Sequence, residues 1–261
     1  MQKRTSFQIV RSVLLALVLR EMRTRLSIKR FGAFWILFEP FAHVSILLLI
    51  SVYIRGKHIP GIEAAVFLAS GIIPFLLFRN IYFKGMEAIA SNRALFSYKQ
   101  IKPLDTILSR AVVEVIISAC LYVLMMFFLG FFWNYDVGIV APLGWGGTMV
   151  VGILLSFGIG LNLCVLAELF PDIKYFIRLM FFPMYLLSGV IFPIWILPPE
   201  ILGWLLWNPY LHIIDILRQH VFENYPFVPG VEITYPLKIA LVLLFSGLML
   251  LRLKRDRLVA I

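Results

Sequence analysis

The sequence has few charged residues. Only 15% of its 261 residues are Asp, Glu, Lys or Arg, whereas 61% are hydrophobic. An ordinary soluble domain carries roughly 25% charged residues, so this composition excludes a chain that covers itself with polar surface. Several uncharged runs are as long as the roughly 17 to 25 residues that a helix needs to cross a bilayer. The sequence therefore predicts an all-α integral membrane protein.

Motifs for catalysis and for metal binding are also lacking. No GxxxxGK[ST] run is present, so the chain has no recognisable phosphate-binding loop for ATP hydrolysis. HExxH and GxSxG motifs are missing as well. The two cysteines, Cys120 and Cys164, lie in apolar runs without metal-ligand spacing, which favours a packing role. We therefore expect no catalytic residues, no metal and no cofactor in this chain.

Positive charge is concentrated between the apolar runs. The net charge is +10, and all but four of the 24 basic residues fall on one side of six predicted spans. The exceptions are Arg55, Lys57, Arg218 and Lys238. The positive-inside rule places that side, with both termini, in the cytoplasm and argues against a nucleic-acid partner. The six predicted spans are Phe34–Ile54, Ala64–Tyr82, Ile107–Phe132, Leu143–Leu166, Phe176–Ile196 and Ile233–Leu253.

The region 197–232, between the last two spans, is apolar but interrupted. Prolines divide this region and the residues just before it into helical pieces that are too short to cross the bilayer. They are Pro193, Pro198, Pro199 and Pro209. This pattern predicts an outer re-entrant helical hairpin. The alternative is a pair of helices lying flat on the outer surface, anchored by Trp195, Trp204 and Trp207.

Residues 1–33 predict an amphipathic helix in the cytoplasmic interface. Apolar residues recur every three or four positions between Val13 and Ile28, while Arg20, Arg23 and Arg25 occupy much of the remaining circumference. The arginines suit lipid phosphates or an acidic protein surface, and they also suit a simple topological role at the first span.

Two carboxylates are expected inside the membrane. Glu39 precedes Pro40, which kinks the first span and brings the carboxylate near its inner third. Glu114 lies one turn after Arg110, so we expect these two side chains to pair within the third span.

The segment from Ser91 to Arg110 combines basic residues with apolar side chains in a piece too short to be a domain. Phe96, Tyr98 and Ile101 favour docking into a partner protein, although an ordinary polar loop is the alternative. After Pro103, Asp105 is placed to cap the third span.

Aromatic residues are abundant within the spans. Ring faces suit the C–H surfaces of sugars without fixed donor geometry, although each ring can equally be a packing or lipid-facing residue. The rings concerned are Trp35, Phe38, Phe41, Phe75, Phe78, Phe181, Phe182 and Tyr185.

Seven motifs in order along the chain resemble the permease subunits of type-2 ABC exporters for capsular polysaccharide, of the KpsM type. Relatives of that family export O antigen or teichoic acid. The motifs are LREMRTR (19–25), FWILFEP (34–40), GIIPFLLF (71–78), SNRALF (91–96), ELFPDI (168–173), FPIWILP (192–198) and WNPYLHIIDILR (207–218).

The resemblance implies one ABC exporter transmembrane domain over residues 1–261. Its parts are the amphipathic segment 1–33, spans one to five within 34–196, the re-entrant region 197–232, span six at 233–253 and a tail at 254–261. It also implies a homodimer in the bacterial inner membrane, paired with two copies of a separate ATPase that binds ATP and Mg²⁺. The first, second and fifth spans would line a channel for an acidic lipid-linked polysaccharide. A periplasmic co-polymerase or adaptor and an outer-membrane exporter would complete the system.

The expected site residues fall into four groups. Coupling to the ATPase is assigned to Phe96, Ser97, Tyr98, Lys99, Ile101, Lys102, Pro103 and Leu104. The cytoplasmic entrance is assigned to Arg20, Arg23, Arg25, Lys29, Arg30, Glu39, Glu168 and Asp172. Pro171, between the last two, is expected to interrupt the helix there. Channel lining is assigned to Trp35, Phe38, Phe41, Phe75, Phe78, Phe182 and Tyr185. The periplasmic gate is assigned to Trp195, Trp204, Trp207, His212 and Asp215.

Two alternatives to a capsule exporter follow from the same sequence. The first is an O-antigen or teichoic-acid permease. The second is a membrane-embedded glycan-modifying enzyme, whose candidate acids and bases are Glu200, His212, Asp215, His220 and Glu223.

Overall fold

The computed structural model describes residues 5–27, 32–55, 62–98, 100–255 and 258. Within these residues it is helical, as predicted, and contains α-helices α1 to α9 and the 3-10 helices η1 and η2. Their bounds are α1 Ser6–Ser27, α2 Gly32–Arg55, α3 Ala64–Met86, η1 Ala90–Ser97, α4 Pro103–Trp133, α5 Pro142–Leu169, α6 Ile173–Leu187, η2 Ile194–Ile196, α7 Pro199–Leu205, α8 Pro209–Val221 and α9 Thr234–Leu253.

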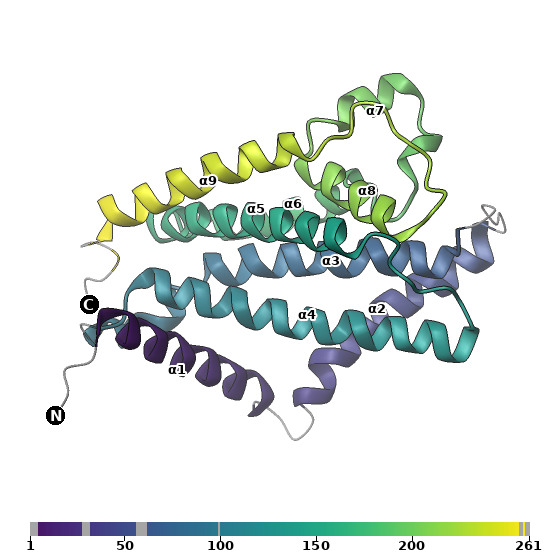
Figure 1. The fold of residues 1–261 in the computed structure, drawn as a ribbon. Helices are drawn as coiled ribbons and strands as arrows, with labels where there is room; N and C mark the ends of the chain where they lie inside the picture. The colour runs from purple at the N-terminus through teal and green to yellow at the C-terminus, as the bar shows by residue number, and fades with distance from the viewer. Residues whose placement is uncertain (1–4, 28–31, 56–61, 99, 256–257, 259–261) are drawn as a thin grey trace.

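The long helices α3, α4, α5 and α9 run along the length of an elongated bundle (Figure 1). The most extensive contacts join α5 to α9 and α3 to α5, so α5 packs between α3 and α9. At one crossing a Cβ atom on Gly85 of α3 would lie 3.2 Å from the Cα of Gly160 of α5, so the two backbones approach closely because both residues are glycine. Among the described residues, α3, α4, α5 and α9 are long and apolar enough to cross a membrane.

Five of the six predicted spans coincide with helices. The first lies within α2, and the second, third, fourth and sixth match α3, α4, α5 and α9, the last to within one residue. The predicted fifth span, Phe176–Ile196, is wrong at its end because α6 stops at Leu187. The chain then turns through Gly189, whose φ of 64° lies in the left-handed region that ends helices. With 15 residues, α6 is about 22 Å long, short of the roughly 30 Å hydrocarbon layer.

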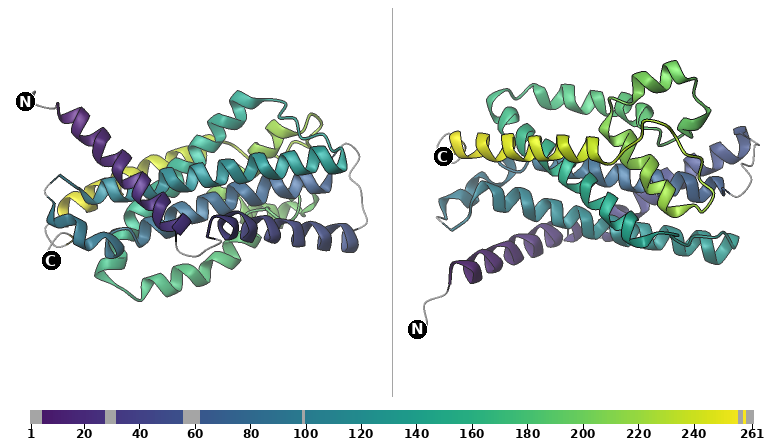
Figure 2. Two further views of the ribbon diagram at one scale, coloured as in Figure 1. Left: turned by 90° about the horizontal axis from the view of Figure 1, so that it is seen from below. Right: turned by 45° about the horizontal axis from the view of Figure 1, so that its top comes forward.

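The two ends of the bundle differ in content. One end, which we call the terminal end, holds the start of α1, the C-terminal end of α9, η1 and the turn between α5 and α6 (Figures 1 and 2). The opposite end, the hairpin end, holds α7 and the turn between α4 and α5. The four segments of the terminal end were predicted to be cytoplasmic, and the fold brings them together.

Local sequence explains where α4 begins and ends. Pro103 occupies its first turn, and the Lys102 N–H donates a hydrogen bond of 2.9 Å to the Asp105 carboxylate. The predicted capping role of Asp105 is therefore confirmed. Asn134 follows the last residue of α4 with a φ of 56°, a left-handed conformation that Asn tolerates at a helix C-terminus.

Prolines divide the region after α6 into short helices, as predicted. Pro199 begins α7 and Pro209 begins α8, where the Asn208 side chain accepts a hydrogen bond of 3.0 Å from the Tyr210 N–H. The helix α8 packs against α3 and α5, and most of its side chains are buried. In contrast, Trp204 on α7 is exposed. The α8 helix is therefore part of the bundle rather than a covering on it.

Candidate functional site

A charged cluster joins α1 to α4 at the terminal end. The Glu114 carboxylate is buried and lies 2.6 Å from Nη1 of Arg25, which also lies 3.3 Å from Glu21 through its Nε. The expected pair between Arg110 and Glu114 is therefore not formed. Arg110 Nε instead lies 3.6 Å from the Glu21 carboxylate. The reason is that α1 packs on α4 and brings its own charged side chains close to Arg110 and Glu114.

The arginines predicted for the entrance differ in their surroundings. Arg20 donates a hydrogen bond to the Asn92 side chain, and Arg25 pairs with Glu114, so both attach α1 to the rest of the chain. Arg23 is exposed. The arginines were predicted to contact lipid phosphates or an acidic protein surface, and for Arg25 the acidic group is Glu114 on α4 of the same chain. Lys29 and Arg30 lie outside the described residues, as does the side chain of Glu39.

The acidic residues of the predicted entrance flank the turn between α5 and α6. Glu168, near the end of α5, pairs with Arg93 of η1 at 2.5 Å. Asp172 is exposed and immediately precedes α6. Pro171 lies between the two helices, and its predicted interruption of the helix is confirmed.

The predicted coupling segment is only partly helical and only partly exposed. The short helix η1 ends at Ser97, so most of the predicted stretch lies in the connection to α4 and in its first turn. Phe96 is 5% exposed and packs in a cluster with Ile89, Ile107 and Cys164. Tyr98, in contrast, is 65% exposed. Phe96 therefore anchors the segment, and Tyr98 is available to a partner.

The other predicted coupling residues follow the same division. Ile101 and Leu104 are half-buried against the cluster around Phe96, and Pro103 is buried. Ser97 and Lys102 are exposed. Lys99 lies outside the described residues.

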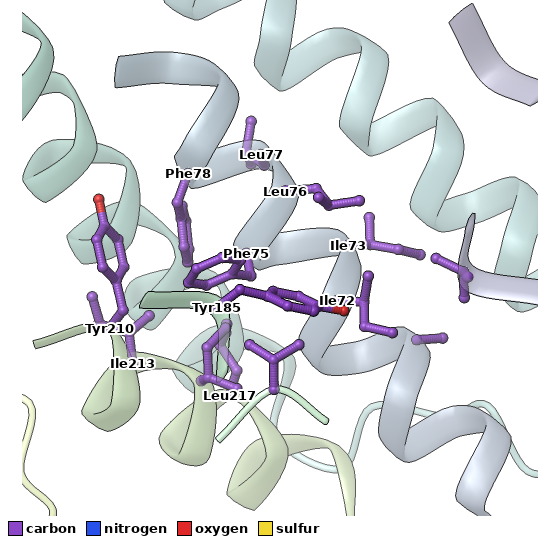
Figure 3. Close-up of a cluster of buried hydrophobic side chains, with 14 of the residues drawn as sticks. Ile72, Ile73, Phe75, Leu76, Leu77, Phe78, Tyr185, Tyr210, Ile213 and Leu217 are labelled. Carbon is purple, nitrogen blue, oxygen red and sulfur yellow. The ribbon is translucent and has the colours of Figure 1, made fainter. Parts of the chain in front are cut away.

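Three of the rings predicted to line a channel are packed in the protomer core. Phe75, Phe78 and Tyr185 are at most 5% exposed, and Phe75 packs against both Tyr185 of α6 and Tyr210 of α8 (Figure 3). The ring centroids of Phe75 and Tyr185 are 5.4 Å apart, and those of Phe78 and Tyr210 are 5.8 Å apart. In this conformation these rings offer no surface to a substrate, because other helices cover them.

The remaining predicted rings are closer to the surface. Trp35 and Phe38 on α2 are exposed and contact each other edge to face, with ring centroids 5.5 Å apart. Phe182 on α6 is also exposed. Phe41 is half-buried against Phe128 of α4. Of the rings predicted to line a channel, Trp35 and Phe38 of α2 and Phe182 of α6 are thus the exposed ones.

At the hairpin end, the two predicted polar gate residues are buried. His212 Nδ1 accepts a hydrogen bond of 3.1 Å from the Glu232 N–H, so Nε2 carries the proton and donates to the Leu206 carbonyl at 2.8 Å. Asp215 accepts hydrogen bonds from the Tyr225 hydroxyl at 2.5 Å and from Gln219 at 3.0 Å. Burial raises the pKa of the Asp215 carboxyl, while these two hydrogen bonds oppose the rise.

The predicted gate tryptophans are more exposed than these polar groups. Trp204 and Trp207 are exposed, and the Trp207 carbonyl accepts a hydrogen bond of 2.7 Å from the Tyr235 hydroxyl. Trp195 is half-buried and packs edge to face on Phe67 and Tyr225. The tryptophans thus lie at different depths of the hairpin end.

Arg218 of α8 was not among the predicted site residues, yet its side chain contacts several other segments. Its guanidinium is buried and donates to the carbonyls of Gly189 at 2.7 Å, Val190 at 2.6 Å and Phe67 at 3.2 Å. Arg218 thereby ties α8 to α3 and to the turn after α6. Its sequence signal was its place among the few basic residues outside the cytoplasmic blocks.

The candidate acids and bases of the enzyme alternative differ in their surroundings, and His220 is half-buried. His212 and Asp215 are engaged in the hydrogen bonds that hold the hairpin end together, whereas Glu200 and Glu223 are exposed. Within the described part of the chain, no group of three His, Cys, Asp or Glu side chains is placed to hold a metal ion.

Comparisons with known proteins give a consistent picture. Residues 12–222 match the family model described as ABC-2 type transporter. The chain is 36% identical to the polysialic acid transport protein KpsM of Escherichia coli over 97% of both chains. It is 26% identical to the capsule polysaccharide export inner-membrane protein CtrC of Neisseria meningitidis serogroup B, covering 84% of this chain and 82% of CtrC. It is 25% identical to the corresponding protein BexB of Haemophilus influenzae, covering 81% of this chain and 80% of BexB.

Proposed function

Because the chain belongs to the ABC-2 type transporter family, we propose that it is the inner-membrane permease of an ATP-driven exporter of capsular polysaccharide. The observation that carries this proposal is the similarity to a polysialic acid transport protein over 97% of both chains. Two further relatives are named for capsule polysaccharide export, which favours a capsule over O antigen or teichoic acid. In this role the chain is a transport subunit and not an enzyme.

The energy source is a separate ATPase, because the chain has no phosphate-binding loop. Two ATPase copies, each binding ATP and Mg²⁺, would dock on the terminal ends of two copies of this chain. Tyr98 is the aromatic contact for this docking, since it is exposed and Phe96 fixes the segment that carries it. Exposed Ser97 and Lys102 flank it.

The substrate path runs between two copies of this chain, along α2, α3 and α6. The exposed rings Trp35, Phe38 and Phe182 are its lining, because they are free to stack on sugar faces. Phe75, Phe78 and Tyr185 lie in the core of the protomer and stabilise the packing of α3 and α6. A stack of rings holds a glycan without a fixed set of donors, so the chain of sugars slides as it moves.

The substrate enters at the terminal end, which faces the cytoplasm in this proposal. The exposed Arg23 and the basic residues that follow it in the sequence attract an acidic glycan or the phosphate of its lipid anchor. At the hairpin end, α7 and α8 form a re-entrant gate facing the periplasm, held by Arg218. Beyond it, a periplasmic adaptor and an outer-membrane exporter receive the polymer.

The first test is co-purification of the full chain with the product of the neighbouring ATPase gene. Tyr98→Ala is expected to weaken ATPase binding about 30-fold, since truncating a central aromatic contact costs about 2 kcal/mol of binding. Trp204→Ala is the matched control, because this exposed aromatic residue lies at the opposite end of the bundle. If the wild-type chain recovers no ATPase, the exporter assignment is wrong.

The capsule assignment is tested separately in the native host. Deletion of the gene is expected to remove acidic polysaccharide from the cell surface while the polymer accumulates in the cytoplasm. A loss of O antigen or teichoic acid instead, with surface capsule unchanged, would move the assignment to that branch of the family.

A further inference from the structure

The segment from Glu87 to Arg93, which runs from the end of α3 into η1, contacts four other helices through polar side chains. The contacts are Arg20 of α1 with Asn92, Arg110 of α4 with Ser91, Arg93 with Glu168 of α5, and Arg178 of α6 with Glu87. One short segment therefore connects α3 to α1, α4, α5 and α6. It adjoins Tyr98, the proposed contact with the ATPase.

In two of these four contacts, one of the two partners is buried. Asn92 is buried, and its amide also donates a hydrogen bond of 2.8 Å to the Ala88 carbonyl. Arg110 is buried as well, and donates to Ser91 at 2.7 Å and to the Lys84 carbonyl at 3.0 Å. Separating either contact would leave buried polar groups without partners, which is costly. The α1 and α4 helices are thus firmly attached to the segment.

The other two contacts are exposed ion pairs. The side chains of Arg93 and Arg178 are each 52% exposed, whereas their partners Glu168 and Glu87 are 13% and 34% exposed, so each pair has its arginine open to water. Exposed ion pairs contribute little to stability because water and salt screen them. These pairs can therefore open and close without unfolding a neighbouring helix.

The helix α6, which carries Arg178, is weakly packed. Among the 15 residues of α6, Tyr185 is the buried one, and one face of the helix is exposed. A break at Pro171 separates α6 from α5, so the angle between the two helices can change at this turn. Several contacts hold α6 to α3: the rings of Phe181 and Tyr185 pack on Phe75, Phe181 also lies against Phe83 and the Arg79 guanidinium, and Arg178 pairs with Glu87.

We propose that Glu87, Arg93, Glu168 and Arg178 form a releasable clamp between the segment 87–93 and the two helices that meet at Pro171, α5 and α6, and that this clamp opens and closes in each transport cycle. The inference rests on the proposed function and deepens it. The four are positioning residues: the closed clamp holds α6 in the arrangement described here. Movement of η1 by the ATPase breaks the two exposed pairs, while α1 and α4 remain attached and follow η1.

A reversible cross-link tests the requirement for opening. The variant carries Arg93→Cys and Glu168→Cys, with the exposed Cys120 replaced by Ser, and a reducible bis-methanethiosulfonate joins the two new thiols. In the reconstituted complex with the ATPase, the variant keeps the pair of Glu87 and Arg178, and its export is expected to be lost on cross-linking and to return on reduction to the level of the untreated variant. Each single-cysteine variant treated with the same reagent is the control. Unchanged export by the fully cross-linked chain would overturn the proposal.

A second measurement needs neither export nor the ATPase. Spin labels at the exposed positions 90 of η1 and 179 of α6, in the isolated chain in lipid nanodiscs, leave both ion pairs intact and report the distance between the two elements. Raising the salt concentration to about 1 M screens exposed pairs, so a second, longer distance is expected to become more populated. A single distance that does not respond to salt or to bound ATPase overturns the clamp. Absence of ATPase binding or of export by the wild-type chain would instead count against the proposed function alone.

Discussion

The guanidinium carbon of Arg218 lies 3.6 Å from the centroid of the Phe67 ring. This cation–π contact accompanies three hydrogen bonds to backbone carbonyls, and together they accommodate a charged side chain in a buried position. Gly71 provides the room, because a Cβ atom there would lie 2.3 Å from Arg218 Nη2. Through this contact α8, α3 and the turn after α6 form one unit.

Replacing Arg218 should therefore weaken the hairpin end. In Arg218→Ala, buried carbonyls lose their donors, at a cost of about 1–3 kcal/mol for each group left unpaired. Arg218→Lys should be intermediate, because lysine keeps the charge but not the planar set of donors. Thermal unfolding in detergent measures the effect, with the exposed Arg252→Ala as the control. A wild-type Tm for Arg218→Ala would contradict the role of this residue.

The buried pair between Arg25 and Glu114 should be coupled in a double-mutant cycle. Removing one partner leaves a charge in a shielded place, so Arg25→Gln and Glu114→Gln are each expected to lower the free energy of unfolding by about 3 kcal/mol. The double variant should lose clearly less than the sum. Arg23→Gln on the same helix is exposed and should change stability by about 0.5 kcal/mol or less. Additive losses in the double variant would show that the two side chains do not interact.

Phe96 and Tyr98 should respond to truncation in opposite ways. Phe96→Ala leaves a cavity in the cluster that includes Ile89 and Cys164, and is expected to lower stability by about 3–5 kcal/mol. Tyr98→Ala removes an exposed side chain and should leave the Tm unchanged while it reduces ATPase binding. Unfolding and co-purification of the same preparations separate the two effects. Equal loss of stability in both variants would contradict the division between anchor and contact residue.

The exposed rings of the proposed path should affect export without affecting stability. Trp35→Ala, Phe38→Ala and Phe182→Ala are each expected to slow export by about tenfold, because each removes a stacking face worth about 1 kcal/mol or more. Phe75→Ala should lower the Tm instead, since its ring is buried. Phe245, an exposed ring on α9, is the matched control. If Phe245→Ala slows export as much as the path variants, lining by α2 and α6 is wrong.

Sequence reasoning was successful where short-range chemistry decides the outcome. Proline placement predicted the short helices after α6 and the break before it, and Asp105 was correctly assigned as a helix cap. Long uncharged runs located α3, α4, α5 and α9 closely, because a helix of this kind depends on its own composition. The end of α6 was misplaced, since apolar residues continue beyond the turn at Gly189.

The sequence by itself determined that the chain is a helical membrane protein, where most of its helices lie and which segments carry its positive charge. These properties depend on residues that are close together in the chain. Only the tertiary structure decided that Glu114 pairs with Arg25 of α1, that Phe75 and Phe78 are buried, and that Arg218 joins α8 to α3. The physical reason is that helices apolar on every face carry no periodic signal of their neighbours. Their partners are set by how the helices pack.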